Sequence, residues 1–294
     1  MYPSRFRYEA PRSLDEALAL LVQYGDDAKV LAGGQSLVPL MKLRFAAPEL
    51  LVDINNVPGL GHHREDADGT LRVGALCRHV DLERSALLAA KHPLMAAAAP
   101  LIADPIVRNR GTLVGSLCHA DPQGDWASVL LALGGSVVAL GPGGRRTIPA
   151  ADFAVGPFQN TLLPGEIAIE AVIPPPQGVA TGTYLKLERR VGDFATAGVA
   201  VALDTVAGSV VRAGIALTGV GPSTIHAAAA EAALVGRPLS AATIEEAAQL
   251  AADVARPKSD HRGSAAYKKH VVATFVRRGL GRVPDEVDSE GVAA

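Results

Sequence analysis

The sequence predicts an α+β protein with two small subdomains of α/β type on its N-terminal side and a C-terminal domain of antiparallel sheet and helices. Three observations support this fold class. Short apolar runs typical of strands alternate with amphipathic helical runs up to Ile173. Three consecutive prolines then occupy positions 174–176, which is typical of a linker. Beyond them, strand-like runs come first and alanine-rich helical runs follow.

The first domain is expected to span residues 1–56 and to form a compact α/β unit. Ser13 and Glu16 have the spacing of a capping box, which predicts that a helix begins after Ser13. A glycine-bearing segment follows the second strand, and its Ser36 is a candidate cap for the next helix. Strands separated by helices favour a parallel sheet. The expected strands are 6–10, 28–32 and 50–54.

The second domain is expected to span residues 57–176 and the third residues 177–294. The second has a mixed pattern, in which the turn signal Asp68-Gly69 precedes a strand. The third has three strands of a small antiparallel sheet, then three helices and an acidic tail from Asp285. The expected strands of the second domain are 70–75, 136–140, 146–148 and 167–173. In the third, strands are expected at 182–188, 195–204 and 210–218 and helices at 227–234, 241–255 and 263–278.

Composition excludes several classes of protein. A net charge of −2 favours neither nucleic acid nor an anionic membrane as the main partner. The longest uncharged run, 126–144, is interrupted by two glycines, so a membrane span is not expected, and the N-terminus has no apolar signal-peptide stretch. Only two cysteines occur, Cys77 and Cys118, which excludes a self-contained four-cysteine iron–sulfur cluster. We therefore expect a cytoplasmic protein.

Two glycine-bearing segments are the strongest candidates for a ligand site. The first runs from Leu31 to Leu37. The second runs from Val107 to Leu117 and contains the basic run Arg108-Asn109-Arg110 followed by Gly111 and residues 112–116. Small residues let backbone N–H groups converge on an anion, so two such segments suit a ligand with two linked phosphates. Neither has the spacing of a Rossmann fingerprint or a P-loop, so another dinucleotide fold is indicated. Plain strand-to-helix turns beside solvated arginines are the alternative interpretation.

Other polar residues have both a ligand-binding and a structural interpretation. Asp121 and Asp125 could accept hydrogen bonds from ribose or adenine, or could cap a helix. His119 could orient a ligand, although a histidine beside a turn is more often structural. Lys186 shares a strand face with a tyrosine and a glutamate, and its spacing slightly favours a surface salt bridge over a binding role. No catalytic triad and no cluster of metal ligands is visible in the sequence.

Taken together, the segments resemble a known family, the FAD-binding medium subunits of molybdenum hydroxylases of the carbon monoxide dehydrogenase and xanthine dehydrogenase type. The resemblance covers essentially the whole chain, and its motifs occur in order. They are Ala32–Leu37, Met41–Arg44, Leu51–Ile54, Arg108–Thr112, Gly115–Ser116, His119–Pro122, Leu163–Ile167, Tyr184–Lys186, Arg189–Arg190 and Gly192–Phe194.

The resemblance implies how FAD is held. The two N-terminal subdomains would bind it in the manner of the vanillyl-alcohol oxidase fold, with the first glycine segment on the diphosphate and the second completing the cradle. Asp125 would bind toward the adenosine half, Ile102 and residues 167–168 would lie beside the flavin ring, and Lys186 would lie near its pyrimidine end. The implied FAD-binding residues are Leu31, Ala32, Gly33, Gly34, Gln35, Ser36, Leu37, Ile102, Thr112, Gly115, Ser116, Cys118, His119, Asp121, Asp125, Ile167, Ala168 and Lys186.

By the same resemblance the chain is an oxidoreductase subunit that passes electrons from two [2Fe–2S] clusters through FAD to an external acceptor such as a quinone. The clusters would lie on a small partner and the molybdenum cofactor on a large one, in a dimer of heterotrimers. No residue of this chain is expected to be catalytic or to bind a metal, and carbon monoxide, an aldehyde, a purine or another N-heterocycle all remain candidate substrates. The alternatives are a stand-alone FAD oxidoreductase and a flavin-free assembly subunit.

The sequence departs from the family pattern at one position. The family commonly has Gly-Gly where this chain has Val114-Gly115. A β-branched side chain disfavours a positive φ, so the second segment is expected to be displaced or to hold FAD less tightly.

Overall fold

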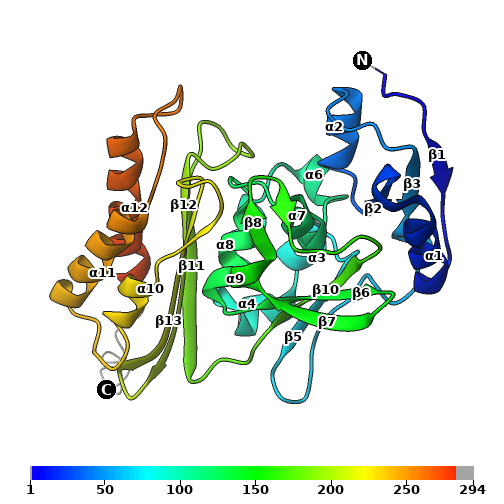
Figure 1. Ribbon diagram of the computed structural model, residues 1–294. Coiled ribbons are helices and arrows are strands. Elements are labelled where there is room, and N and C mark those ends of the chain that lie inside the picture. Colours follow the sequence, from blue (N-terminus) through cyan, green and yellow to red (C-terminus); the bar gives the residue numbers. More distant parts are fainter. Residues whose placement is uncertain (1, 283–294) are drawn as a thin grey trace. The chain divides into compact units, whose positions relative to one another are not determined.

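The computed structural model of the protein describes residues 2–282 and contains two compact units (Figure 1). The first unit contains the chain up to Arg84 together with Ile102–Asp121 and Gly134–Pro175. The second contains Ser85–Leu101, Pro122–Leu133 and residues 176–282. The predicted mixture of helices and sheets is confirmed, and the three predicted domain spans stay predictions. The predicted acidic tail from Asp285 lies outside the described residues.

The first sheet of the first unit is parallel, as predicted, with strand order β1-β3-β2. Its strands are β1 (Arg7–Glu9), β2 (Ala28–Leu31) and β3 (Leu50–Asp53), and α1 (Leu14–Tyr24) packs on β2 and β3. Ser13 caps α1 by accepting a hydrogen bond from the Glu16 N–H. Short η1 (Gly25–Asp27), α2 (Leu37–Lys42) and η2 (Ile54–Asn56) complete this part.

The second sheet of the first unit is antiparallel, with strand order β4-β5-β10-β6-β7. Its short β4, and a separate two-stranded hairpin of β8 and β9, were not predicted because two or three residues give no measurable alternation. The strands are β4 (His63–Glu65), β5 (Leu71–Gly74), β6 (Ser136–Gly141), β7 (Gly144–Pro149), β8 (Ala154–Gly156), β9 (Gln159–Asn160) and β10 (Ile167–Ile173). The helices are α3 (His79–Glu83), α6 (Pro105–Arg108), α7 (Leu113–His119) and α9 (Ala150–Phe153).

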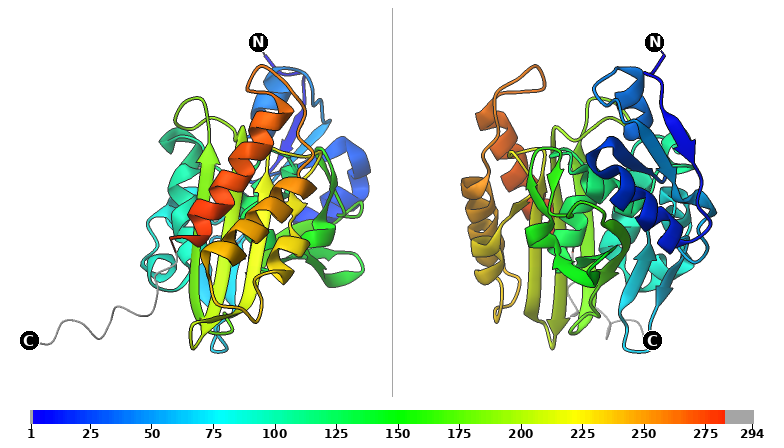
Figure 2. Two further views of the ribbon diagram at one scale, coloured as in Figure 1. Left: turned by 90° about the vertical axis from the view of Figure 1, so that its left-hand side faces the viewer. Right: turned by 45° about the vertical axis from the view of Figure 1, so that its right-hand side comes forward.

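The second unit is a three-layer structure around the antiparallel sheet β11-β12-β13-β14. Helices α10–α12 cover one face of this sheet, as Figure 2 shows, while α5 and α8 pack against β11, β12 and β13. The strands are β11 (Val179–Leu187), β12 (Ala197–Val206), β13 (Ser209–Thr218) and β14 (Ile225–His226). The helices are α4 (Ala86–Lys91), α5 (Pro93–Ala98), η3 (Ala99–Leu101), α8 (Asp125–Ala132), α10 (Ala228–Ala232), α11 (Ala241–Val254) and α12 (Ala265–Leu280).

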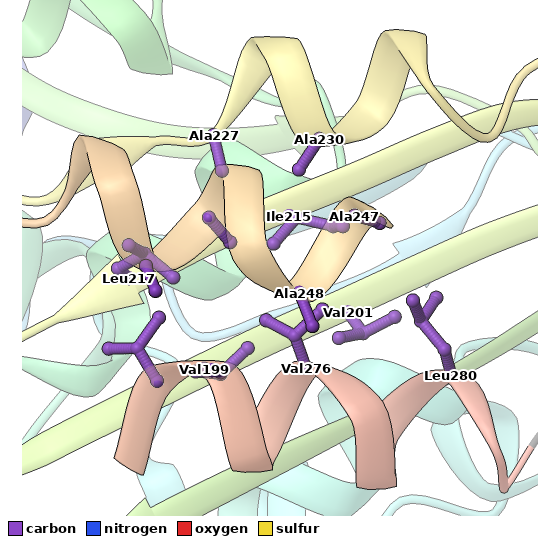
Figure 3. Packing of buried hydrophobic residues seen from close by; sticks show 14 of the residues in the cluster. Val199, Val201, Ile215, Leu217, Ala227, Ala230, Ala247, Ala248, Val276 and Leu280 are labelled. Carbon is purple, nitrogen blue, oxygen red and sulfur yellow. The ribbon is translucent and has the colours of Figure 1, made fainter. Parts of the chain in front are cut away.

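Small side chains let the layers of the second unit approach closely. Val199, Val201 and Ile215 of the sheet pack against Ala248 and Val276 of the helices (Figure 3). A Cβ added to Gly214 of β13 would lie 1.8 Å from the carbonyl oxygen of Ala132 on α8, so only glycine fits at this contact. The low aromatic content therefore fits a core built from close backbone approach. Within residues 2–282 no helix combines the length and the apolar character that crossing a bilayer requires.

Candidate functional site: the paired glycine segments

The first glycine segment and a polar turn leave the same edge of the parallel sheet. β2 and β3 run side by side in the same direction, so the segments that follow them begin at the carboxyl ends of both strands. Residues 32–36 follow β2, and Asn55 follows β3. In sheets of this kind ligands bind at that edge. The fold therefore puts the first glycine segment where a ligand site is expected.

The first segment presents unused backbone donors. Gly34 has φ +74°, which favours glycine, and α2 begins three residues later at Leu37. Among residues 2–282, the N–H groups from Gly33 to Leu37 donate to no protein acceptor. Ser36 was predicted to cap α2, and this is wrong: its backbone is helical (φ −104°, ψ −48°) rather than extended, so its hydroxyl makes no capping bond. The segment thus keeps its amides and this hydroxyl for another partner.

The second segment begins α7 with a true cap. Thr112 is extended (φ −124°, ψ 149°), and its hydroxyl accepts a hydrogen bond from the Gly115 N–H at 3.1 Å. A Cβ on Gly115 would lie 2.7 Å from that hydroxyl oxygen, so a larger residue there would require the Thr112 side chain to shift. Val114 lies inside α7 without a positive φ and is 2% exposed. Its side chain is buried and its φ is not positive, so the strain from which the displacement was expected is absent, and weaker FAD binding stays a prediction.

The two segments touch through their glycines. A Cβ on Gly33 would lie 2.4 Å from the Arg110 carbonyl oxygen and 2.8 Å from the Gly111 Cα. A Cβ on Gly111 would in turn lie 2.8 Å from the His79 ring. Burial lowers the pKa of His79 to about 4, so this ring is neutral near pH 7. Glycine is therefore required at both positions by contact with backbone or with a buried ring.

These residues fit a diphosphate group. The segments contain no acidic side chain, and the unused N–H groups of the first lie at the start of α2. Arg110 belongs to the second segment, and Arg78 lies beside it. Such an arrangement stabilises an anion through backbone dipoles and nearby cations. The geometry therefore favours phosphate binding over the alternative of a plain turn.

Arg108, which could have been solvated, instead braces the first unit. Its guanidinium donates to the Glu83 carboxylate at 2.9 Å and to the carbonyl oxygens of Ile102 and Ala103 at 3.0 and 2.9 Å. Ala103 has φ +47°, so these bonds hold a conformation that alanine rarely adopts. Ile102 itself is 6% exposed. The predicted flavin neighbour Ile102 therefore lies on a turn with a fixed backbone.

The remaining candidates of the first unit have structural contacts. The His119 ring packs on Phe158 with 5.1 Å between ring centroids, and burial lowers its pKa. The Cys118 carbonyl accepts a hydrogen bond from Asn160 at 2.7 Å. Ile167 and Ala168, both buried, begin β10. Asp121 follows α7 and is half-buried. The FAD-binding assignments of these residues stay predictions.

Two residues assigned by resemblance, Asp125 and Lys186, meet in the second unit. The Lys186 ammonium donates to Asp125 Oδ2 at 2.9 Å and to the Leu101 carbonyl at 3.0 Å, and it lies 3.5 Å from Glu188. Tyr184 donates to Asp125 Oδ1 at 2.6 Å. The Lys186 side chain is only 2% exposed, so the surface salt bridge favoured by its spacing is wrong. Its strand β11 is packed against by α5, and its ammonium is bonded to Asp125 at the start of α8.

Hydrogen bonds join most of this cluster, which we call the Lys186 cluster (Leu101, Asp125, Ser128, Tyr184, Lys186, Glu188 and Thr218). The exception is the buried Glu188 Oε2, which has no hydrogen-bond partner among residues 2–282. Thr218 donates to Ser128 at 2.6 Å, and Ser128 donates to the Asp125 carbonyl at 2.9 Å. Burial raises the pKa of Asp125 even though Lys186 and Tyr184 lower it, and burial also raises the pKa of Tyr184. Asp125 opens α8 but does not cap it, since the N-cap residue is Gly124.

Sequence reasoning missed Asn55 and Arg78, which connect the two glycine segments. Asn55 donates to the Ala32 carbonyl at 2.8 Å, and Arg78 donates to the Arg110 carbonyl at 2.6 Å and to the Asn55 side-chain oxygen. Asn55 could have been found from its place after a strand parallel to β2. No local pattern marks Arg78, because its partners lie 23 and 32 residues away along the chain.

Comparison with known proteins gives the chain its relatives. A family model described as the FAD binding domain in molybdopterin dehydrogenase matches residues 4–176, and one described as the CO dehydrogenase flavoprotein C-terminal domain matches residues 182–283. The carbon monoxide dehydrogenase medium chain of Hydrogenophaga pseudoflava is 43% identical over 283 residues, which are 95% of this chain and 97% of that one. The alpha subunit of the 6-hydroxypseudooxynicotine dehydrogenase complex of Paenarthrobacter nicotinovorans is 41% identical, over 96% of this chain and 95% of that one.

A solved structure agrees with these sequence matches. Carbon monoxide dehydrogenase from Hydrogenophaga pseudoflava, in a form that lacks the Mo-pyranopterin moiety of its cofactor, contains a chain that superposes with a TM-score of 0.92 at 45% identity. The match covers 96% of this chain and 98% of that chain. These matches confirm the predicted FAD-binding domain and the C-terminal domain that follows it.

Proposed function

This chain belongs to the FAD-binding subunits of the molybdenum hydroxylase family, and from that premise we propose that it conducts electrons through FAD within a multi-subunit oxidoreductase. Electrons would enter from [2Fe–2S] clusters and leave to an external acceptor. The single observation that carries the proposal is the contact between two glycine segments with unused N–H groups, because it provides a cradle for the diphosphate that FAD contains.

The FAD would be held by the set of residues that the resemblance assigns. Residues 31–37 and 112–116 would bind the diphosphate, and Ile102 and residues 167–168 would contact the flavin ring. Cys118, His119, Asp121, Asp125 and Lys186 complete the proposed set. Bound FAD supplies redox chemistry that no side chain of this chain can supply, whereas the chain supplies position and electrostatics. The Lys186 charge is countered by Asp125 and by Glu188, so its effect on a nearby anion is weaker than that of a lone ammonium.

The electron donor is proposed to lie on another chain. Cys77 and Cys118 are the only cysteines, and both are free, which is too few for a cluster of their own. Burial raises the pKa of Cys77 to about 12, so its thiol is a poor metal ligand. A small subunit with two [2Fe–2S] clusters and a large molybdenum-cofactor subunit would be the partners. A dimer of heterotrimers, a quinone-type acceptor and a cytoplasmic location belong to the proposal on the resemblance alone.

The substrate of the complex is not set by this chain. The two relatives quoted above have nearly equal identity to it, 43% and 41%, yet their names specify carbon monoxide and 6-hydroxypseudooxynicotine. Substrate choice therefore belongs to a pocket on the molybdenum-cofactor subunit.

The test is to purify the tagged full chain from its native host and to record its visible spectrum and its co-purifying chains. Flavin and iron–sulfur absorbance together with one large and one small partner is the expected result. A lone yellow protein that oxidises NADH would support the stand-alone flavoenzyme instead. A colourless complex would support the flavin-free assembly subunit.

A further inference from the structure

We propose that Asn55 and Arg78 form a clamp that positions the two glycine segments for a diphosphate. The inference deepens the proposed FAD binding and rests on it. The clamp consists of two side chains that bond to each other and, separately, to one backbone carbonyl in each segment.

Asn55 holds the first segment. Its Nδ2 donates to the Ala32 carbonyl oxygen at 2.8 Å and also to the Asp53 carboxylate, while its Oδ1 accepts a hydrogen bond from Arg78. Every polar atom of the amide is therefore used. The assignment of its oxygen and nitrogen is unambiguous, because exchanging them would set the amide nitrogen against the arginine donor.

Arg78 holds the second segment. Its Nη1 donates to the Arg110 carbonyl oxygen at 2.6 Å, and its Nη2 donates to Asn55. The backbone assists, since Arg78 pairs with Thr112 and the His79 N–H donates to the Gly111 carbonyl at 3.0 Å. A planar guanidinium can reach two acceptors at once, which the single point charge of a lysine cannot do in the same geometry.

The clamp determines which way the first segment presents its donors. A peptide group is planar, with its carbonyl and N–H on opposite sides, so holding the Ala32 oxygen directs the Gly33 N–H away from Asn55. The Arg110 oxygen held by Arg78 is also the atom nearest to the missing Cβ of Gly33, at 2.4 Å. Arg78 therefore fixes the position of the second segment against Gly33.

The charge of Arg78 is a second, independent indication of an anionic ligand. The hydrogen-bond acceptors of its guanidinium are a carbonyl oxygen and an amide oxygen, both neutral. The side chain is half-buried, and burial lowers its pKa from the ordinary value, yet an arginine stays charged. The Asp81 and Asp53 carboxylates raise that pKa and Arg110 lowers it, but among residues 2–282 neither carboxylate accepts a hydrogen bond from the guanidinium. A bound anion would therefore find this charge available for direct pairing.

The experiment is a binding titration on the purified complex after its flavin has been removed. FAD affinity is measured by flavin fluorescence, and ADP, which carries the diphosphate without the flavin, is measured by competition. We expect Arg78→Lys to raise both dissociation constants about tenfold, the scale of one charge-assisted hydrogen bond. Arg72→Lys is the matched control, because Arg72 also forks between two acceptors in the first unit, Asp66 and Glu170, and should leave both constants unchanged.

A double-mutant cycle tests whether the two residues act as one. Asn55→Ala and Arg78→Met should each weaken FAD and ADP, and the double variant should be no weaker than the worse single variant. Independent effects that multiply would overturn the clamp. Melting temperatures of the flavin-free variants, compared with that of Arg72→Lys, separate lost binding from lost folding.

The outcomes separate the clamp from the proposed function. If the wild type binds FAD and ADP and the Arg78→Lys and Asn55→Ala variants bind them equally well, the clamp is overturned and the proposed function stands. If only FAD affinity falls and ADP is unaffected, the clamp is also overturned, since the diphosphate is then not involved. A wild type that binds ADP but no FAD contradicts the proposed function while the clamp is still measured on ADP. Binding of neither ligand overturns both.

Discussion

The two units differ in whether the polar groups at their candidate sites are hydrogen-bonded within the chain. In the first unit, the N–H groups from Gly33 to Leu37 have no acceptor among residues 2–282, and Asn55 and Arg78 hold the two glycine segments by binding their carbonyl oxygens. In the second unit, the Lys186 ammonium, the Asp125 carboxylate and the Tyr184 hydroxyl are buried and bonded to one another. The difference shows how the evidence for a binding role varies within the chain. Unused donors on a fixed backbone indicate a ligand directly, whereas the contacts of Asp125 and Lys186 within the chain account for their burial, so their FAD-binding assignment rests on the resemblance alone.

Breaking the Lys186 cluster should have the largest effect on stability. Asp125→Ala removes the carboxylate that is hydrogen-bonded to the buried Lys186 ammonium and leaves only Glu188 at 3.5 Å, so the free energy of unfolding should fall by about 3–5 kcal/mol. Urea titration of the full chain measures it. Asp125→Asn combined with Lys186→Met removes both charges and should recover most of the loss. A loss under about 1 kcal/mol for Asp125→Ala would show that the cluster does not hold the second unit together.

The next effect is a pH dependence in the first unit. His79 has a folded pKa of about 4 and an ordinary value of 6.5, so the unfolded chain binds more protons between these two pH values. Neutral His79 therefore contributes about 3 kcal/mol to the free energy of unfolding above pH 6.5, and this contribution is lost as the pH falls toward 4. Unfolding free energies at several pH values should show a shallower slope in His79→Gln than in the wild type. Equal slopes would mean that His79 is not held neutral against Gly111.

A methyl group between the two glycine segments should have an effect of middle size. Gly33→Ala places a Cβ 2.4 Å from the Arg110 carbonyl oxygen, so one segment must move. The free energy of unfolding should fall by about 1–3 kcal/mol, and the affinity for FAD should fall as well. Gly61→Ala is the control, because a Cβ there meets nothing within 4 Å. Differential scanning calorimetry and FAD titration of both variants make the comparison. Unchanged FAD affinity in Gly33→Ala would contradict the cradle.

The smallest effect compares two serines that precede helices. Ser13 caps α1, so Ser13→Ala should cost about 1 kcal/mol of stability without changing FAD affinity. Ser36 makes no capping bond, so Ser36→Ala should change the stability of the flavin-free chain by less than about 0.5 kcal/mol and yet weaken FAD binding. If Ser36→Ala destabilises the flavin-free chain as much as Ser13→Ala does, the hydroxyl serves the fold and is not reserved for a ligand.

The features that were predicted correctly are those that depend on residues close together in the sequence. The Ser13 cap, the parallel sheet and β10 at 167–173 all follow from local spacing or from the period of apolar residues, and the structure confirms them. The two glycine segments were found for the same reason, since small residues beside a predicted strand mark close backbone approach.

Contacts between distant segments were not predictable in this way. The burial of Lys186 depends on α5, which packs on β11, and on Asp125 at the start of α8, and both precede it by more than fifty residues. Arg78 lies between β5 and α3 in a segment without an unusual local pattern, and its contacts with Asn55 and Arg110 form only when the chain folds. Spacing along one strand correctly placed Tyr184 and Lys186 on one face, but whether that face is exposed is decided by other parts of the chain.

The most direct test of the account is the flavin content of the assembled complex, measured by releasing and quantifying FAD from purified wild type, Gly33→Ala and Gly61→Ala. Stoichiometric FAD in the wild type and in Gly61→Ala, with a clear deficit in Gly33→Ala, is the predicted result. A wild-type complex without FAD, or equal FAD in all three, would contradict the central claim that the paired glycine segments hold the cofactor.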